Sequence, residues 1–457
     1  MEPIELKRLL LGFHLFINGK MRVNLKIAGI LVLLGGSIFS CKPKYEEPAY
    51  SKGEINPTRF VMIGGGHTAG YMNDALYHEG QQNSLAALIS NQLKIVGGSY
   101  INQPLVNNSS VGIGLTGLSQ LKLGYKTDCK GVSSLSPIRM ASSGDASIWG
   151  DNLYSATNKF GNFGVPGLKL MQVASSNFGQ SNSFFGRMAS SSSASVLDDA
   201  LSSDPTFFSV FLGIEDVLDF AKSGGTNNNL PSTSSFQNAY SNVLQVMTAN
   251  GSKGVIATIP DVTEMPYFTT IPWNGLTLDA ANNTTLNSIY NPLGYYFQIG
   301  SNPFMMVDST ANAFAVRQIL SDELLLLSLP LDSVKCNQMG VLFPIRDEFV
   351  LDQGEIQLLQ TRITEYNNII RNLAAQFGLA VVDVEDFSSR LKTGFVYNGV
   401  TMSSKFVSGG AYSLDGIHFN AKGNALLANE FLKAINLKYK SRIPLLNANA
   451  YDATLFP

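Results

Sequence analysis

Charged side chains are scarce in this sequence of 457 residues, because Asp, Glu, Lys and Arg together make up only 14% of it. The formal net charge is −2, and no stripe of basic residues runs through the chain. A protein without a positive surface cannot neutralise a phosphate backbone, so nucleic acid is excluded as an expected partner. Gly, Ser and Asn are plentiful, and we expect the surface to consist largely of neutral polar groups.

Long hydrophobic runs and metal-binding motifs are also lacking. The apolar run 27–34 near the N-terminus is too short to span a bilayer, so no transmembrane helix is expected. The three cysteines and four histidines form no paired Cys or His motif, so we expect neither a metal nor another cofactor. No internal repeat is found, and the length suits one large domain.

A targeting segment is predicted for residues 1–40. Residues 21–26 are short and positively charged, residues 27–34 are apolar, and a small Ser precedes Cys41, which resembles a bacterial lipoprotein signal. We expect Met21 to be the natural start, Cys41 to become the lipidated first residue, and residues 41–57 to form a tether. This predicts an exported protein that is lipid-anchored to the bacterial outer membrane, on its periplasmic or its cell-surface face.

Short apolar runs alternate with helical segments over residues 58–440. This alternation predicts parallel β-α-β units, with about five strands in a mainly parallel sheet and helices on both faces. Insertions are predicted near 97–156 and 269–345, the second with a helical stretch around 311–327, and residues 441–457 form a tail. Strands are expected at 59–63, within 160–170, and at 206–212, 254–259 and 379–384, with the main helices at 84–93, 236–249, 352–377 and after Asn420.

The stretch Asp415-Gly416-Ile417-His418 lies just before the last helix, for which Asn420 is the expected N-cap. A carboxylate close to an imidazole can hold one ring nitrogen and raise the basicity of the other, as in a nucleophile–base–orienter relay. The alternative is a loop Asp and a half-buried His that satisfy only their own hydrogen bonds.

Three further Gly-containing blocks follow predicted strands. They are Ile63-Gly64-Gly65-Gly66-His67-Thr68-Ala69-Gly70, then Asn162 to Gly167, then Gly213-Ile214-Glu215-Asp216. The carboxyl ends of parallel strands meet at one edge of a sheet, so we expect these blocks to converge with Asp415 and His418 on one crevice.

Together the four blocks resemble the SGNH/GDSL hydrolase (lipase/esterase) family, and more narrowly its exported lipoprotein members with long insertions. The resemblance covers about residues 58 to 439 and implies a three-layer α/β/α, flavodoxin-like sandwich. It also implies a serine esterase mechanism, in which His418 and Asp415 activate a Ser at the end of the first strand. The developing oxyanion would be held by backbone N–H groups at positions 66 and 167 and by an Asn amide in the third block.

The sequence departs from the family pattern at two of these positions. Gly66 stands where the family has its nucleophilic Ser, and Glu215 stands where it has the oxyanion-binding Asn. An ionised carboxylate accepts hydrogen bonds and donates none, so Glu215 would repel an oxyanion. Loss of the Ser alone lowers turnover about a millionfold in a well-studied serine protease. We therefore expect ordinary serine-esterase catalysis to be absent.

Two neighbouring residues could replace the missing nucleophile. Thr68 could supply a hydroxyl in a shifted register, and His67 could act as base for a water with help from Glu215; alternatively His67 only fills the space that Ser leaves. A metal set of Glu215, His67 and His418 has no supporting motif.

Three functions follow, and whether the chain is an enzyme stays open. The favoured one is a lipid-anchored pseudoesterase that binds an acylated small molecule or a carbohydrate. The second is an active ester hydrolase, cleaving acyl or O-acetyl esters with water or a non-standard nucleophile. The third is an assembly lipoprotein whose insertions bind a partner. Cys129 and Cys336 form a disulfide or remain buried thiols, and the sequence favours neither.

Overall fold

The computed structural model describes residues 49–311 and 313–457, of which residues 50–457 form one compact unit. The predicted signal segment, Cys41 and the first part of the predicted tether, up to residue 48, lie outside the described residues. Within the described ranges, none of the helices has the length and apolar character needed to cross a membrane.

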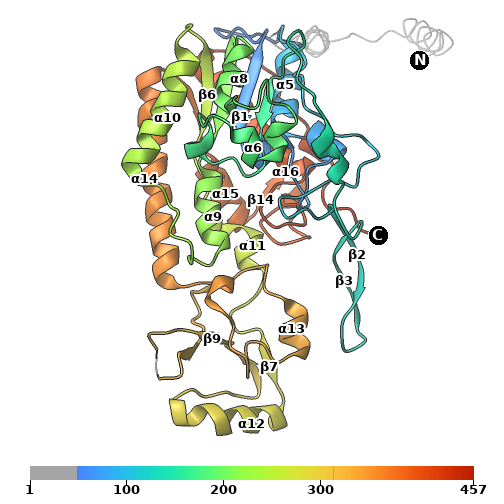
Figure 1. The fold of residues 1–457 in the computed structure, drawn as a ribbon, viewed down its shortest axis with the longest axis vertical. Helices are drawn as coiled ribbons and strands as arrows, with labels where there is room; N and C mark the ends of the chain where they lie inside the picture. The colour runs from blue at the N-terminus through green and yellow to red at the C-terminus, as the bar shows by residue number, and fades with distance from the viewer. Residues whose placement is uncertain (1–48, 312) are drawn as a thin grey trace, which may run out of the picture. The chain divides into compact units, whose positions relative to one another are not determined.

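A parallel sheet of five strands forms the centre, as predicted (Figure 1). The spatial order β13-β6-β5-β1-β4 makes β1 and β5 neighbours, with β4 on the other side of β1. In chain order this is the flavodoxin-like arrangement 2-1-3-4-5, which reverses direction at β1. The strands are β1 (Phe60–Gly64), β4 (Asn162–Gly164), β5 (Phe207–Phe211), β6 (Lys253–Ala257) and β13 (Ala380–Val382).

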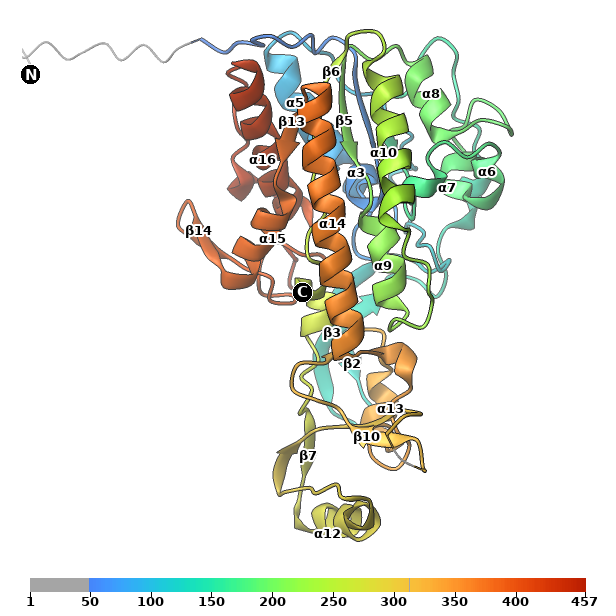
Figure 2. The same ribbon diagram turned by 90° about the vertical axis from the view of Figure 1, so that its left-hand side faces the viewer.

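Helices cover both faces of this sheet, and this confirms the predicted three-layer α/β/α sandwich. On one face α16 (Ala421–Tyr439) packs beside α5 (Leu85–Ile95); on the other α10 (Thr233–Thr248) packs along α14 (Gln353–Phe377) (Figures 1 and 2). Residues on the sheet-facing sides of α10 and α16 are fully buried and apolar, for example Val243, Leu427 and Phe431.

The ends of the main helices are fixed by the residues that the sequence predicts. The Asn420 side chain accepts the Gly423 N–H at 2.9 Å, as expected of the N-cap of α16. Asp352 and Glu355 form a capping box at the start of α14, and Gly378 ends that helix with a φ of 67°.

Shorter elements connect these layers. Most lie at the carboxyl end of the sheet or at its margins. They are α3 (Gly66–Ala69), α4 (His78–Gln82), α6 (Phe178–Ser181), α7 (Ser183–Gly186), α8 (Val196–Ser202), α9 (Ile214–Lys222), α11 (Pro266–Thr269), β12 (Val350–Leu351), α15 (Val384–Thr393) and the hairpin β14 (Phe395–Tyr397) with β15 (Val400–Met402).

The first insertion contains a two-stranded antiparallel ribbon, β2 (Leu121–Thr127) and β3 (Ser133–Arg139), which we call the arm. Most side chains of its outer half are exposed, including Tyr125 and Val132. Since an isolated two-stranded ribbon is marginally stable, contacts at its two ends must fix it.

The second insertion is a small lobe with apolar clusters of its own. Phe304, Met306, Ile319 and Ile345 form one cluster, and Leu278, Leu286 and Phe297 belong to another. The arm and the lobe both lie beyond the same end of the sheet (Figure 1). The lobe's elements are β7 (Leu276–Leu278), α12 (Ala280–Tyr290), β8 (Gly300–Asn302), β9 (Met305–Val307), β10 (Val316–Gln318), β11 (Leu324–Leu325) and α13 (Leu331–Cys336).

The helical stretch predicted around residues 311–327 is wrong. Two strands occupy this segment instead, β10 paired with β9 and β11 paired with β12. Arg317 in β10 forms ion pairs with Asp308 at 2.7 Å and Glu323 at 2.6 Å. Pairing with distant strands and these ion pairs override the helix propensity of an Ala- and Leu-rich segment.

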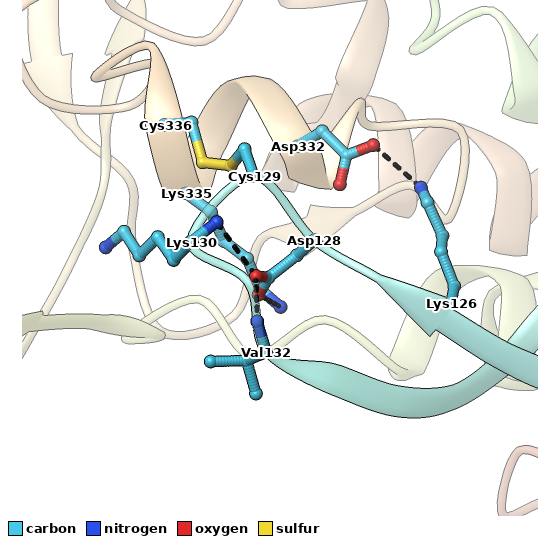
Figure 3. Close-up of a disulfide and its surroundings, with 8 residues drawn as sticks. All are labelled: Lys126, Asp128, Cys129, Lys130, Val132, Asp332, Lys335 and Cys336. Atoms are coloured by element: carbon cyan, nitrogen blue, oxygen red, sulfur yellow. Dashed lines mark hydrogen bonds and ion pairs between the residues drawn. A yellow bond between two sulfur atoms is a disulfide. The ribbon is translucent and has the colours of Figure 1, made fainter.

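A disulfide joins Cys129 at the tip of the arm to Cys336 at the end of α13, and this answers the question that the sequence left open (Figure 3). Their Cα atoms lie 6.5 Å apart, although 207 positions separate them in sequence. Lys126 and Asp332 form an ion pair at 2.7 Å beside the disulfide, and Lys335 and Asp128 another at 3.3 Å. The tip of the arm is therefore held against the lobe.

Candidate functional site

The candidate site lies where β1 and β5 end, at the point where the strand order reverses. A helix begins almost at once after each strand: α3 starts at Gly66 and α9 at Ile214. Gly213 makes the second turn with a φ of 100°, a conformation that favours glycine. Ligands of open α/β sheets bind at such reversal points, beyond the carboxyl ends of the strands.

Gly66 and Glu215 meet across these two strand ends. The Glu215 Oε1 atom accepts the backbone N–H of Gly66 over 3.4 Å, a long hydrogen bond. The same carboxyl group lies against Gly65. A side-chain acceptor therefore occupies the N–H that would otherwise face a developing oxyanion.

His418 fills the space beside Gly66. A Cβ atom built on Gly66 would lie 2.3 Å from the His418 Nε2 atom and 2.7 Å from its Cδ2 atom. Contacts this short are not tolerated between real atoms, so the imidazole stands where the first carbon of a side chain at position 66 would be. His418 Nε2 is buried and has no hydrogen-bond partner among the described residues.

Asp415 and His418 form the pair that the sequence predicts. The Asp415 Oδ2 atom lies 3.0 Å from His418 Nδ1 and also accepts the Asp74 N–H at 3.0 Å. Its Oδ1 atom accepts the N–H groups of Ile417 and His418, both at 2.8 Å. The carboxylate thus has four donors and a fixed orientation.

The charges of this pair reinforce each other. Burial alone would lower the pKa of His418, but the Asp415 carboxylate outweighs burial and raises that pKa above its usual value. Burial alone would raise the pKa of Asp415, but His418 and the two backbone N–H groups hold it below its usual range. Both shifts favour an imidazolium paired with a carboxylate, which is a poor state for a base that has to accept a proton.

His67 lies beside this pair, with its ring centroid 5.0 Å from that of His418. It is 3% exposed, and its ring also packs edge-on against Phe211 and Phe419. Burial and then the positive charge of His418 lower the pKa of His67 to about 3, so the ring is neutral. The structure places His67 as a packed neutral ring, with its Nδ1 atom unpartnered.

Thr68 is fully buried, and its hydroxyl faces β1. A Cβ atom on Gly64 would lie 2.2 Å from the Thr68 Oγ1 atom. Thr68 Oγ1 and His418 Nε2 each lack a hydrogen-bond partner, so the two atoms do not reach each other. A nucleophile needs its base within hydrogen-bond reach, which Thr68 does not have in this arrangement.

The second block contributes structure around α3. The Asn162 side chain donates to the Thr68 carbonyl at 3.1 Å and accepts the Gly164 N–H at 2.8 Å. Gly167 lies in the turn after β4 with a φ of 76°, and its Cβ position faces Leu115. No hydrogen bond joins Gly167 to Gly66 or His418, and its role in an oxyanion hole stays a prediction.

Two carboxylates near the site were missed from the sequence. Asp74 donates its N–H to Asp415, as described above. Asp216 accepts the Leu170 N–H at 2.8 Å, which links the segment just after the second block to the third block. Burial raises the pKa of Asp216 to about 6. Asp216 stands in the third block and could have been noted there, whereas no local pattern distinguishes Asp74.

A cleft of about 480 Å³ opens behind the Asp415 loop. The base of the arm, the turn at Asn73 and the C-terminal residues 452–457 line it. Gly66, His67, Glu215 and His418 do not, so this cleft is distinct from the candidate site at the strand ends. Within the described ranges, no three or more His, Cys, Asp or Glu side chains gather closely enough to hold a metal ion.

The sheet order and the site at its reversal point define the class of protein, an α/β/α sandwich of the hydrolase type. A sequence model of the family described as GDSL-like lipase/acylhydrolase matches residues 60–431, which includes the whole site. The chain belongs to the GDSL-like lipase/acylhydrolase family.

A comparison with solved structures finds similarity to several hydrolases. An α/β hydrolase from the metagenome of Lake Arreo, Spain, is 11% identical, with 84% of this chain and 96% of that chain covered and a TM-score of 0.36. The acetyl xylan esterase AlAXEase is 16% identical, with 59% and 78% covered and a TM-score of 0.25. An acetyl xylan esterase from Geobacillus stearothermophilus is 10% identical, with 60% and 71% covered and a TM-score of 0.28. No significant match is found among curated protein sequences.

Proposed function

We propose that this protein is a degenerate family member, a pseudoesterase that binds an acylated or carbohydrate ligand without hydrolysing it. The observation that carries the proposal is the 2.3 Å between His418 Nε2 and the Cβ position of Gly66. The ring that should accept a nucleophile's proton occupies the nucleophile's place. Removal of a triad Ser costs about a millionfold in turnover, and the residual rate depends on an intact oxyanion hole. Glu215 occupies part of that hole.

The groups left in the crevice favour a hydroxyl group as the part of the ligand that binds there. A protonated His418 Nε2, which is buried in the free protein, can donate one hydrogen bond to a ligand that reaches it, and the half-buried Glu215 carboxylate accepts others. A hydroxyl group both accepts and donates, so it can bind the two side chains at once. An ester carbonyl only accepts, so it could bind His418 but would give the Glu215 carboxylate no donor, and the Gly66 N–H already binds Glu215. A carbohydrate therefore fits better than an intact ester.

The turnover of p-nitrophenyl acetate and p-nitrophenyl butyrate by the purified protein tests the absence of hydrolysis. We expect the wild-type protein and His418→Ala to show the same background rate. Activity that His418→Ala abolishes would end the proposal. Asp219→Asn, on the same helix as Glu215, is a control that leaves the crevice unchanged.

Ligand binding is tested separately, by saturation-transfer NMR with a panel of disaccharides that carry or lack O-acetyl groups. We expect the free hydroxyl forms to bind, and Glu215→Gln to weaken binding about tenfold, since a hydrogen bond to a charged group contributes about 1.5 kcal/mol. Equal binding by Glu215→Gln and wild type would place the ligand elsewhere.

A second candidate function is ester hydrolysis by water. The Asp415–His418 hydrogen bond of 3.0 Å favours it, since a fully abandoned site has no need of that pair. Such an enzyme would turn over p-nitrophenyl esters after fluorophosphonate treatment, because no hydroxyl nucleophile is used, and would lose this activity in His418→Ala. Turnover that fluorophosphonate abolishes would instead indicate a hydroxyl nucleophile.

We also propose that the protein is exported and lipid-anchored through Cys41. The sequence pattern around that residue supports this, with a positive stretch, a short apolar run and a small residue before the cysteine. Metabolic labelling with palmitate in a bacterial host tests it. We expect label in the wild-type chain and none in Cys41→Ser, whereas equal labelling of both would contradict the anchor.

A further inference from the structure

A tight turn at Asn73 and Asp74 connects the candidate site to the arm. Met72 and Ala75 exchange two backbone hydrogen bonds of 3.2 Å, and the two residues between them have φ values of 54° and 58°. Asn and Asp tolerate this left-handed conformation better than most residues, but it still costs about 1 kcal/mol or more per residue. Such a conformation persists where its surroundings hold it.

On one side, three hydrogen bonds join the turn to the segment that carries Asp415. The Asn73 N–H donates to the Ser413 hydroxyl at 2.9 Å, and the Asn73 side-chain oxygen accepts the Leu414 N–H at 3.0 Å. The Asp74 N–H donates to Asp415 Oδ2 at 3.0 Å. The same oxygen lies 3.0 Å from His418 Nδ1, so the Asp74 N–H fixes the carboxylate oxygen that binds the histidine.

On the other side, the turn is held by the base of the arm. The Leu121 N–H donates to the Asn73 carbonyl at 2.8 Å. Arg139, the last residue of β3, binds Asp74 Oδ2 at 2.5 Å through one guanidinium nitrogen and the Ser119 carbonyl at 2.6 Å through another. The Tyr71 hydroxyl donates to Asp74 Oδ1 at 3.0 Å, so both carboxylate oxygens of Asp74 are bound.

The Arg139–Asp74 ion pair orients the turn more than it stabilises the fold. Its side chains are 27% and 29% exposed, and ion pairs near solvent stabilise a fold by about 1 kcal/mol at most. A guanidinium fork, however, fixes direction, because its donors are planar and rigid. Arg139 thereby fixes the position of the Asp74 backbone N–H relative to the Asp415 carboxylate.

We infer that Asp74 and Arg139 are positioning residues for the Asp415–His418 pair, and that they connect this pair to the arm. Neither residue contacts Gly66 or Glu215 through any hydrogen bond of the described chain. The inference goes beyond the proposed function, because it concerns how the pair is assembled and holds whether or not an ester is cleaved.

Arg139 could act on His418 through its own charge or by positioning Asp415, and these two effects change the pKa of His418 in opposite directions. The charges that act on His418 come from Asp415, Glu215 and Lys222, and the neighbouring titratable rings are His67 and Tyr71. If Arg139 acted only through its own positive charge, its removal would raise the pKa of His418. If it acts by positioning Asp415, its removal weakens the Asp415–His418 hydrogen bond and lowers that pKa.

NMR of the full folded chain tests the inference, with the Nδ1 proton signal and the pKa of His418 as readouts. In Arg139→Gln we expect the low-field Nδ1 proton signal to weaken and the pKa of His418 to fall by about one unit. Arg139→Lys should restore most of both, since it keeps one charged donor. Arg371→Gln is the matched control, because it removes another half-exposed Arg–carboxylate ion pair, with Asp383 and Glu385.

Asp74→Asn is a second variant that keeps the backbone N–H but weakens the bond to Arg139. We expect it to weaken the low-field Nδ1 proton signal, which is the readout for this variant because loss of the Asp74 charge lowers the pKa of His418 directly. It keeps the inference testable where Arg139→Gln does not fold. An unchanged Nδ1 proton signal in either folded variant would overturn the inference. A rise in the pKa in Arg139→Gln would also overturn it, in favour of a direct charge effect.

Discussion

His418 Nε2 lies 2.3 Å from the point where a Cβ atom of residue Gly66 would stand. The ring is held there by Asp415 and packs against Tyr71 and His67, with centroid distances of 4.9 Å and 5.0 Å. His418 therefore occupies the space that a side chain at position 66 would need. We expect that a Ser introduced at position 66 does not by itself form a triad, because His418 occupies the space that its side chain needs.

Substitution of Gly66 tests this relationship. We expect Gly66→Ala and Gly66→Ser to lower the free energy of unfolding by about 1–3 kcal/mol, since an added carbon overpacks the site. The ring must also leave Asp415, so the His418 Nδ1 proton signal should be lost. Chemical unfolding and NMR measure both effects, and Gly66→Ser with Glu215→Asn should remain without esterase activity.

Gly150→Ala is the control for this series, because a Cβ atom on Gly150 meets nothing within 4 Å. It should leave stability nearly unchanged. If Gly66→Ala were as stable as the wild-type protein and kept the Nδ1 signal, His418 would not be fixed as described.

The pH dependence of stability tests the buried neutral His67. Its pKa of about 3 lies below the ordinary value of about 6.5, so between these values the unfolded chain binds a proton that the folded chain does not. Stability is therefore lost as the pH falls through this window, by up to about 1.4 kcal/mol per pH unit. We expect His67→Phe to remove this slope, because Phe fits among Phe211 and Phe419 and does not titrate.

Urea unfolding between pH 6.5 and 4 measures the difference between His67→Phe and the wild-type protein. We expect this difference to grow by about 3 kcal/mol towards pH 4. His418 does not disturb this comparison, because its raised pKa affects stability only above the ordinary value, where rising pH removes stabilisation. His78→Gln, at a half-buried site in α4, should keep the acid slope. A pH-independent difference for His67→Phe would contradict a neutral His67.

The layered fold could be predicted because its signals are local. Apolar runs such as 206–212 are short and bounded by Gly or Pro, and Asn420 and Asp352 are strong caps next to clear apolar stripes. The approach of Asp415 to His418 also follows from local spacing. Each of these features depends on neighbouring residues in the sequence, so it can be predicted without knowing which distant segments meet.

The remaining features depend on partners far apart in sequence. The pairing of Cys129 with Cys336 and of Asp74 with Asp415 joins segments whose meeting no local pattern encodes. Residues 324–325 form a strand because they pair with β12, about 25 residues further along the chain, against the helix propensity of the segment. The position of His418 in the space that a side chain at position 66 would need is a packing outcome, which the sequence indicates only through Gly66.

Opening of the disulfide tests how the arm is held. We expect Cys129→Ser to speed hydrogen exchange in residues 121–139 and in α13, because the outer half of the ribbon has little other support. The sheet strands should exchange as before. Lys126→Gln, which removes only the neighbouring ion pair with Asp332, should have a much smaller effect. Unchanged exchange in the Cys129→Ser arm would show that the disulfide does not fix it.

Replacement of Asn420 tests how strongly this side chain stabilises the segment between the Asp415–His418 pair and α16. Its side chain caps α16 and also donates to the carbonyls of Gly410 and Tyr412, both at 3.1 Å. We expect Asn420→Ala to lower the free energy of unfolding by about 2 kcal/mol or more, above the usual cost of a lost cap. Ser232→Ala, which removes the exposed cap of α10, should cost about 1 kcal/mol. Equal costs would show that the two extra bonds contribute little.

The central claim is that no group beside His418 can form an acyl bond. Intact-protein mass spectrometry after incubation with a fluorophosphonate probe tests it most directly. The account predicts an unchanged mass for the wild-type protein and for His418→Ala. A stoichiometric adduct that maps to Thr68 or another residue of the crevice, and that disappears in His418→Ala, would contradict it.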